Sequence, residues 1–176
     1  PGIDHLSAKK DIDNLNKKGE ILGFESYTGG LIKRNNENPW GYKFTWNPMN
    51  VITAGVDGAR YLDNGKIINI PYNKIFSSVK HIKFKNSDLY EGYPNRDSLK
   101  YRPLYKLENV KTLKRGTLRH PGFCKSWNIL VNLGLTDDIN IIKNPKLKTY
   151  FDFLNYKLNL SNLKEAKKYI KKNFLI

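Results

Sequence analysis

Short segments with a two-residue period alternate along this chain with segments of helical spacing, and long irregular connections separate them. A two-residue period places successive side chains on opposite faces of a β-strand, whereas a 3.6-residue period forms one face of a helix. The two-residue period and the β-branched and aromatic residues predict strands over residues 20–27, 42–46, 66–71, 79–84 and 110–119.

Helices are predicted between and after these strands. Asn47-Pro48 begins one of them, because Asn is a good N-cap and Pro suits the first helical position. The predicted helices cover residues 5–18, 47–61, 98–105, 121–133, 146–156 and 161–173. Because connections such as 31–41 and 70–79 are long and irregular, we predict an α+β fold. It has a mixed, largely antiparallel sheet with helices mainly on one face, which leaves the other face free for a partner or a substrate.

The single cysteine, Cys124, cannot form an internal disulfide, and the three histidines are too scattered to predict a metal site. One thiol is typical of a reducing compartment, so we expect a cytoplasmic protein. No run of apolar residues approaches the roughly 18 that a membrane span requires. The chain begins at Pro1-Gly2 rather than Met, so we expect a one-domain piece of a longer protein.

The formal net charge of +15 has three interpretations. A nucleic-acid partner would explain it, although no nucleic-acid-binding motif is present. A solvated lysine face on the last predicted helix explains much of it, since Lys164, Lys167, Lys168, Lys171 and Lys172 share that pattern. A third interpretation is local, because a few well-placed arginines suffice to bind a small acidic substrate.

Gly29-Gly30 follows a predicted strand, and two glycines can let the backbone approach a ligand closely. A plain turn explains the pair equally well. The chain contains no G-x-G-x-x-G string and no Walker-type phosphate loop. The residues themselves therefore predict no dinucleotide-binding element.

Arg96 lies in a turn with the sequence Tyr-Pro-Asn-Arg-Asp-Ser over residues 93–98. Pro stiffens such a turn, and Asn, Asp and Ser hydrogen-bond back to its backbone. A guanidinium held in this way can bind a carboxylate through two parallel hydrogen bonds. The alternative is a surface turn in which Arg96 pairs with a nearby acid.

Strand alternation places Arg115, Thr117 and Arg119 on one face of the strand predicted over residues 110–119. Two guanidiniums and a hydroxyl on one patch of sheet suit an anionic ligand. An exposed strand face with charged residues is the alternative.

Five strings resemble the saccharopine dehydrogenase family, in the family's order and at close to its spacing. Together they span about three quarters of the chain and leave the region from residue 136 onward unmatched. The strings are residues 1–5 (PGIDH), 26–31 (SYTGGL), 38–46 (NPWGYKFTW), 93–98 (YPNRDS) and 115–119 (RGTLR).

The resemblance implies the glutamate-forming branch of this family, which converts saccharopine to 2-aminoadipate semialdehyde and glutamate, or the reverse, in lysine metabolism. It implies NAD or NADP as cofactor and a homodimer. Residues 1–176 would form the substrate-binding and dimerisation domain, and the Rossmann domain would lie outside this chain. The segment alone is therefore expected to be inactive. Its expected fold is similar to the C-terminal domain of glyceraldehyde-3-phosphate dehydrogenase and its relatives.

The resemblance also implies roles for individual residues, although it identifies no proton-transfer group. Saccharopine carries several carboxylates, which suit two fixed guanidiniums. The implied substrate-binding residues are Arg96, Thr117, Leu118 and Arg119, and the implied cofactor-contacting residues are Pro1 and Pro48.

Three positions depart from the family pattern. Thr28 stands where the family often has Cys, residues 32–34 read Ile-Lys-Arg, and His120 follows Arg119 where Tyr is usual. These changes leave a related reductive-coupling enzyme, of the carboxynorspermidine or homospermidine type, as an alternative. A basic nucleic-acid-binding module is the alternative from another class.

Overall fold

The computed structural model describes residues 2–33, 40–85, 88–138, 147–160 and 162–174 of the chain. It divides into two units, Pro1–Ser126 and Trp127–Ile176, which are described separately below. The family resemblance predicted one substrate-binding domain over the whole chain, and that assignment stays a prediction.

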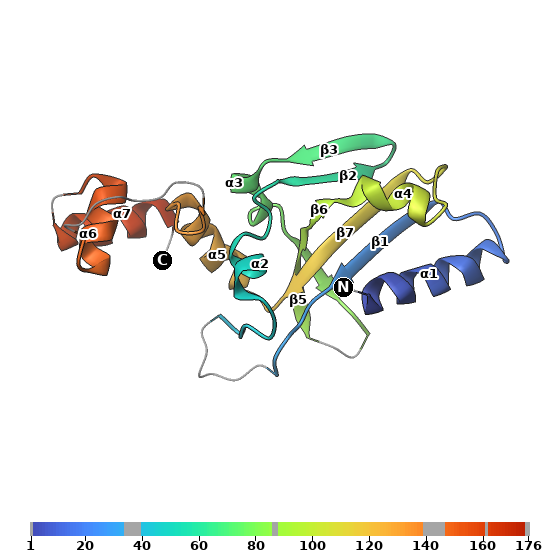
Figure 1. The fold of residues 1–176 in the computed structure, drawn as a ribbon, viewed down its shortest axis with the longest axis horizontal. Coiled ribbons are helices and arrows are strands. Elements are labelled where there is room, and N and C mark those ends of the chain that lie inside the picture. Colours follow the sequence, from blue (N-terminus) through green and yellow to red (C-terminus); the bar gives the residue numbers. More distant parts are fainter. Residues whose placement is uncertain (1, 34–39, 86–87, 139–146, 161, 175–176) are drawn as a thin grey trace. The chain divides into compact units, whose positions relative to one another are not determined.

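The first unit is built on one sheet of seven strands (Figure 1). The strand order is β3-β2-β7-β5-β4, with β1 paired to β7 and β6 paired to β2. Only the β1–β7 and β2–β6 pairs are parallel, so the predicted mixed, largely antiparallel sheet is confirmed. The strands are β1 (Gly23–Thr28), β2 (Ala59–Asp63), β3 (Lys66–Ile70), β4 (Lys80–Lys83), β5 (Leu89–Pro94), β6 (Arg96–Asp97) and β7 (Thr112–Arg119).

The helices of the first unit are mostly short. They are α1 (Ile3–Asn16), α2 (Pro48–Ile52), α3 (Tyr72–Ile75), the 3-10 helix η1 (Ser98–Lys100) and α4 (Tyr101–Leu104). Helix α5 (Phe123–Asn132) begins in this unit and ends in the second. Only α1 among the helices that lie wholly in this unit is longer than five residues, so the sheet is its main scaffold.

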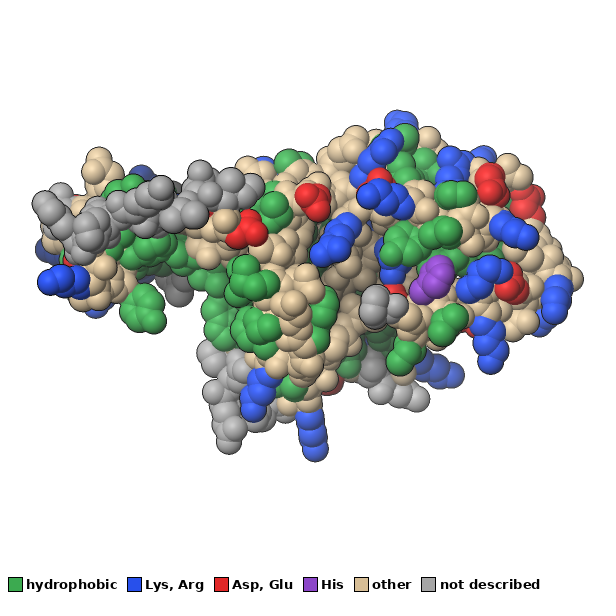
Figure 2. All heavy atoms as spheres, viewed as in Figure 1, with side chains coloured by type: hydrophobic (Ala, Val, Ile, Leu, Met, Phe, Trp, Pro, Cys, Tyr) green, Lys and Arg blue, Asp and Glu red, His purple; other side chains and the backbone are tan. Residues whose placement is uncertain are grey.

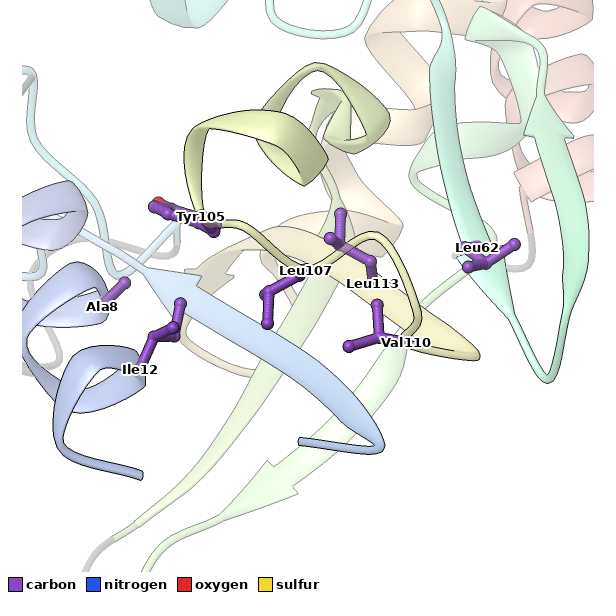
Figure 3. Packing of buried hydrophobic residues seen from close by; sticks show 7 residues of the cluster. All are labelled: Ala8, Ile12, Leu62, Tyr105, Leu107, Val110 and Leu113. Carbon is purple, nitrogen blue, oxygen red and sulfur yellow. The ribbon is translucent and has the colours of Figure 1, made fainter. Parts of the chain in front are cut away.

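The core of the first unit lies between α1 and the sheet, as Figure 3 shows. Ala8 and Ile12 of α1 pack in the same buried cluster as Leu113 of β7 and Tyr105, which follows α4. Truncation of a fully buried aliphatic side chain such as Ile12 to Ala costs about 2–5 kcal/mol of stability. Leu113 therefore lies on the face of β7 that α1 covers, which we call the helix-covered face.

The opposite face of the sheet carries Tyr27, whose ring lies against glycines of two neighbouring strands. A Cβ atom on Gly116 would lie 2.4 Å from this ring, and one on Gly92 would lie 2.9 Å from it. Side chains larger than hydrogen would therefore push the ring off the sheet. On the same face Lys114 Nζ lies 4.5 Å from the centroid of the Tyr61 ring.

The second unit contains α6 (Tyr150–Leu158), α7 (Leu163–Phe174) and the end of α5. A capping box between Thr149 and Asp152 begins α6, and Asn159 ends it in the left-handed conformation. Helix α7 buries Ala166, whereas all five lysines predicted to form its polar face are exposed. The predicted exposure of these lysines is confirmed.

Two of the element predictions were wrong. Residues 42–46 form no strand. The helix predicted over residues 47–61 stops at Ile52, and its last three residues, 59–61, belong to strand β2 instead. Gly55 and Gly58 lie between them with φ values of +91° and +74°, which a continuing helix cannot accommodate. The pairing of β2 with β3 then gives its backbone hydrogen-bonding groups partners in the sheet.

Candidate functional site

The end of β7 presents Arg115, Thr117 and Arg119 on one face, as predicted from strand alternation. Thr117 is opposite Thr28 in the parallel β1 and opposite Tyr93 in the antiparallel β5. Since Leu113 on this side of β7 packs in the core with α1, these three residues share the helix-covered face. Burial raises the pKa of the Tyr93 phenol, while the charge of Arg119 and a hydrogen bond with Thr117 oppose that rise.

Arg115 is tied into the fold. Its guanidinium forms an ion pair with Asp4 of α1, and its carbon Cζ lies 3.9 Å from the centroid of the Tyr101 ring. Its backbone N–H donates to the Ser98 hydroxyl at 2.9 Å. These contacts connect β7 with α1, η1 and α4, so Arg115 is a structural residue.

Arg119 is buried, with 4% of its surface exposed. Its Nη1 donates to the Leu118 carbonyl at 2.9 Å, while among the described residues its buried Nε has no hydrogen-bond partner. Three rings surround its Cζ, with centroids at 4.6 Å for Tyr42, 5.1 Å for Phe123 and 5.9 Å for Tyr93. Aromatic faces attract a cation but do not neutralise it. We call these three rings the aromatic cage of Arg119.

Glu91 is the residue opposite Arg119 in the β5–β7 pair, and it is also buried. Its two carboxylate oxygens accept hydrogen bonds from the backbone N–H groups of Gly122 at 2.8 Å and Cys124 at 2.9 Å. Both N–H groups lie at the beginning of α5, where helix amides lack partners within the helix. The carboxylate that could neutralise Arg119 is thus engaged elsewhere, and no ion pair joins these two residues in the described part of the chain.

Arg96 lies in β6 with a φ of +50°, a conformation that costs a non-glycine residue about 1–3 kcal/mol. The flanking residues hold the turn. Asn95 N–H donates to the Arg115 carbonyl at 3.0 Å, and the Asp97 carboxylate accepts from Leu99 N–H at 2.9 Å. The Asp97 side chain thus bonds back to the backbone as predicted, and the immobilisation of Arg96 stays a prediction. The Arg96 side chain is exposed and has no ion pair with any described residue.

Arg119 lies four positions along β7 from Arg115, which bonds to the turn beside Arg96. At the rise of a strand this spacing is about 13 Å. The structure thus places the backbones of the two predicted anchors at different points of one sheet. Whether the two guanidiniums meet at one ligand stays a prediction.

A cavity of about 660 Å³ lies between α1 and β1. Neither Arg96 nor Arg119 lines it. Its lining includes Asp4, Ser7, Ser26, Thr28 and Gly29, and no lysine or arginine. Since Thr28 pairs with Thr117 and Gly29 lies against Leu118, the cavity borders the end of β7.

Pro48 begins α2 and is exposed. Asn47 accepts a hydrogen bond from Met49 N–H, and Pro48 has no N–H of its own, so neither of the first two positions of this five-residue helix has a free amide for a phosphate. Pro1 lies outside the described residues. Both cofactor assignments stay predictions.

In the described part of the chain, no three His, Cys, Asp or Glu residues gather where they could hold a metal ion. None of the helices there is long and apolar enough to cross a bilayer.

Sequence reasoning missed Glu91 and the cage residues Tyr42 and Phe123 as parts of the site. Two weak signals were available. Tyr42 belongs to the aromatic string at residues 40–46, and Phe123 directly follows Pro121-Gly122 after the arginine strand. Neither signal indicates a ring around a particular guanidinium, because that contact depends on how distant segments fold together.

The known proteins that resemble this chain point to one family. Residues 1–172 match the model of the family described as Saccharopine dehydrogenase C-terminal domain. The chain is 39% identical over 166 residues to the mouse protein named alpha-aminoadipic semialdehyde synthase, mitochondrial, covering 93% of this chain and 18% of that protein. It is 38% identical over 159 residues to saccharopine dehydrogenase [NADP(+), L-glutamate-forming] of Saccharomyces cerevisiae, covering 85% of this chain and 36% of that protein.

The fold is similar to a solved structure of apo saccharopine dehydrogenase (L-Glu forming) from Saccharomyces cerevisiae. The TM-score is 0.71 at 32% sequence identity, and the match covers 99% of this chain and 44% of that one. The chain therefore spans between about a fifth and a little under half of the relatives compared here.

Proposed function

The chain belongs to the saccharopine dehydrogenase family, as its C-terminal domain, and on that premise we propose that it binds the substrate of an NADP-dependent saccharopine dehydrogenase. The reaction proposed for the whole protein converts saccharopine to 2-aminoadipate semialdehyde and glutamate, or the reverse. Relatives with that activity in their names support this proposal.

One observation carries the proposal, namely that Arg119 is a buried cation without a carboxylate partner among the described residues. Removal of a charge from water costs several kcal/mol unless an opposite charge compensates it. The site can recover that cost when an anionic ligand reaches the guanidinium. A carboxylate of the substrate is the group that fits, because its two oxygens match the two donor edges of Arg.

Arg96 is proposed to anchor a second carboxylate. Its strained backbone and exposed, unpaired side chain support a role outside the packing of the fold. Arg96 and Arg119 would hold carboxylates at the two ends of an elongated amino acid, and Thr117 would add a hydrogen bond between them. Fixing both ends orients the carbon that reacts, so the domain contributes to the rate by positioning.

The cofactor is proposed to be NADP, as in the named fungal relatives. A bound nicotinamide supplies hydride transfer. Since the chain contains no G-x-G-x-x-G string, the dinucleotide would be held mainly by other parts of the full-length protein. Pro1 and Pro48 are proposed only to approach it from this domain.

The direct test is an assay of the full-length protein with saccharopine and NADP⁺, following NADPH absorbance and glutamate release. Saccharopine-dependent formation of both products is the expected result. Reductive coupling of polyamine precursors without saccharopine turnover would favour the carboxynorspermidine or homospermidine alternative. Absence of all of these activities would overturn the proposal.

A homodimer is proposed through the sheet face that carries Tyr27. The core helix α1 packs on the other face of the sheet, and the dimer that the family resemblance implies would use the face opposite it. Size-exclusion chromatography with light scattering tests this, and a monomer at high protein concentration would contradict it.

Nucleic-acid binding has less support than substrate binding. On the face shown in Figure 2, Lys and Arg side chains are interspersed with Asp and Glu instead of forming a single basic patch. Binding to DNA that weakens steeply with salt would revive the nucleic-acid alternative.

The cytoplasm is proposed as the location, because Cys124 is a free, buried thiol typical of reducing compartments. The mitochondrial matrix is reducing as well, and the mouse relative is named as mitochondrial. Fractionation of the source cells distinguishes the two.

A further inference from the structure

Gly29, directly after β1, lies unusually close to the backbone of β7. A Cβ atom built on Gly29 would lie 2.6 Å from the Leu118 carbonyl oxygen and 3.0 Å from Leu118 Cβ. Gly23, at the other end of β1, is the contrast, since its Cβ would meet Thr112 Cβ at an ordinary 3.4 Å. Both glycines lie beside β7, and only Gly29 lacks room for a methyl group.

The carbonyl that Gly29 approaches is the one that holds the buried arginine. Arg119 Nη1 donates to Leu118 O at 2.9 Å, which is the one hydrogen bond found for this guanidinium among the described residues. A methyl group at position 29 must displace the Leu118 carbonyl, because the contact is with backbone and not with a flexible side chain. The guanidinium would then lose its hydrogen bond or move with the carbonyl.

We propose that Gly29 is a positioning residue for substrate binding, which acts through the Leu118 carbonyl to fix the guanidinium of Arg119. The inference rests on the proposed function, since it needs Arg119 to bind a substrate carboxylate. It gives the glycine pair a role different from direct contact with a ligand. The missing side chain permits β1 to close on β7 at the point where Arg119 is oriented.

The test compares Gly29→Ala with Gly23→Ala in the full-length protein. Both variants add one methyl group to a glycine beside β7, so Gly23→Ala is a matched control. The dissociation constant for saccharopine, measured by calorimetry, and its KM are both expected to rise about tenfold for Gly29→Ala, because small displacements of an anchor weaken binding steeply. Gly23→Ala is expected to bind like the wild type. Unchanged binding by a folded Gly29→Ala variant would overturn the inference.

A double-mutant cycle with Arg119→Met shows whether the glycine acts through the arginine. If it does, Gly29→Ala added to Arg119→Met changes saccharopine binding by less than about twofold, because the anchor is already lost. An undiminished, additive effect would mean that Gly29 acts by another route. If Gly29→Ala weakened saccharopine binding by destabilising the fold in general, its effect would add to that of Arg119→Met. The cycle therefore distinguishes a positioning role from general destabilisation.

Where Gly29→Ala does not fold, Leu118→Val replaces it in the same cycle. Valine is branched at Cβ, the side-chain atom of Leu118 that lies closest to Gly29, and it suits a strand. Its effect is expected in the same direction, and additivity with Arg119→Met would again contradict the inference. The proposed function fails separately, if Arg119→Met leaves saccharopine binding unchanged. The inference alone fails if Arg119→Met weakens binding and the changes at Gly29 and Leu118 do not.

Discussion

Arg119 and Glu91 are opposite each other on β7 and β5, and yet they form no ion pair. The Glu91 carboxylate binds the N–H groups of Gly122 and Cys124 at the start of α5, and the Arg119 guanidinium lies among aromatic rings. Neighbouring opposite charges on a sheet normally pair. The start of α5 therefore engages the carboxylate opposite Arg119, and we propose that the guanidinium is left for a ligand.

Replacing Glu91 with Gln should destabilise the protein by about 1–3 kcal/mol. Gln keeps one accepting oxygen, so one buried N–H of the α5 start loses its partner. Differential scanning calorimetry should show unfolding several degrees lower, an estimate from the usual relation between stability and Tm. Glu20→Gln is the control, because Glu20 is exposed. Equal melting temperatures for the two variants would contradict the assigned role of Glu91.

Replacing Arg96 with Lys should raise the KM for saccharopine at least about tenfold, since Lys cannot copy a two-bond contact with a carboxylate. Steady-state kinetics of the full-length protein provide the measurement. Arg60→Lys is the matched control, because Arg60 is exposed on the neighbouring strand β2 and its nearest acid, Asp97, is 4.0 Å away. If Arg96→Lys behaves like the control, Arg96 is not an anchor.

Replacing Tyr42 with Leu removes one ring of the aromatic cage and retains an apolar side chain. The cation–π contact contributes about 0.5–2 kcal/mol, which corresponds to an increase in the saccharopine KM of about two- to thirtyfold. Phe44→Leu is the control, since Phe44 contacts Tyr42 and is largely exposed. Similar kinetics for the two variants would show that the cage does not orient Arg119.

The pKa of Glu25 should depend on Lys80. Burial is the largest single influence and raises the pKa of this carboxyl. The hydrogen bond and charge of Lys80, the hydrogen bond from Tyr27 and the charge of Lys114 together outweigh it, so the net pKa lies below its ordinary value of 4.5. The stabilisation that this pair provides is present above pH 4.5 and is lost as the pH falls through the lowered pKa. For a largely exposed pair it amounts to less than about 1 kcal/mol.

In Lys80→Met the carboxyl should titrate at a higher pH than in the wild type, which a pH series of the Glu25 carboxyl ¹³C shift would measure. Lys83→Met, an exposed lysine on the same strand, should leave it unchanged. A Glu25 midpoint that does not move in Lys80→Met would show that the ion pair is absent in solution.

Local patterns predicted the parts of this structure that depend on neighbouring residues. The two-residue period of residues 110–119 placed Arg115, Thr117 and Arg119 correctly on one face, because alternation follows from strand geometry alone. The hydrogen bond of the Asp97 side chain in the turn around Arg96 was also predictable, since it joins residues two positions apart. The helix predicted over residues 47–61 was wrong because Gly55 and Gly58 leave the helical conformation. The residues of β2 that follow gain hydrogen-bond partners in the sheet.

The chemistry around Arg119 could not be predicted in this way. The alternation of β7 does not distinguish an exposed arginine from a buried one, and the cage comes from three separate segments. The same holds for Glu91, whose partners at the start of α5 are distant in sequence. Long-range packing decides these contacts, and a single sequence carries little trace of it.

A crystal structure of the full-length protein with bound saccharopine tests the central claim most directly. The expected result is one substrate carboxylate within hydrogen-bonding distance of the Arg119 guanidinium, including the now unpartnered Nε, and another carboxylate at Arg96. A complex in which every carboxylate binds elsewhere, with Arg119 still bonded only to Leu118, would contradict the account.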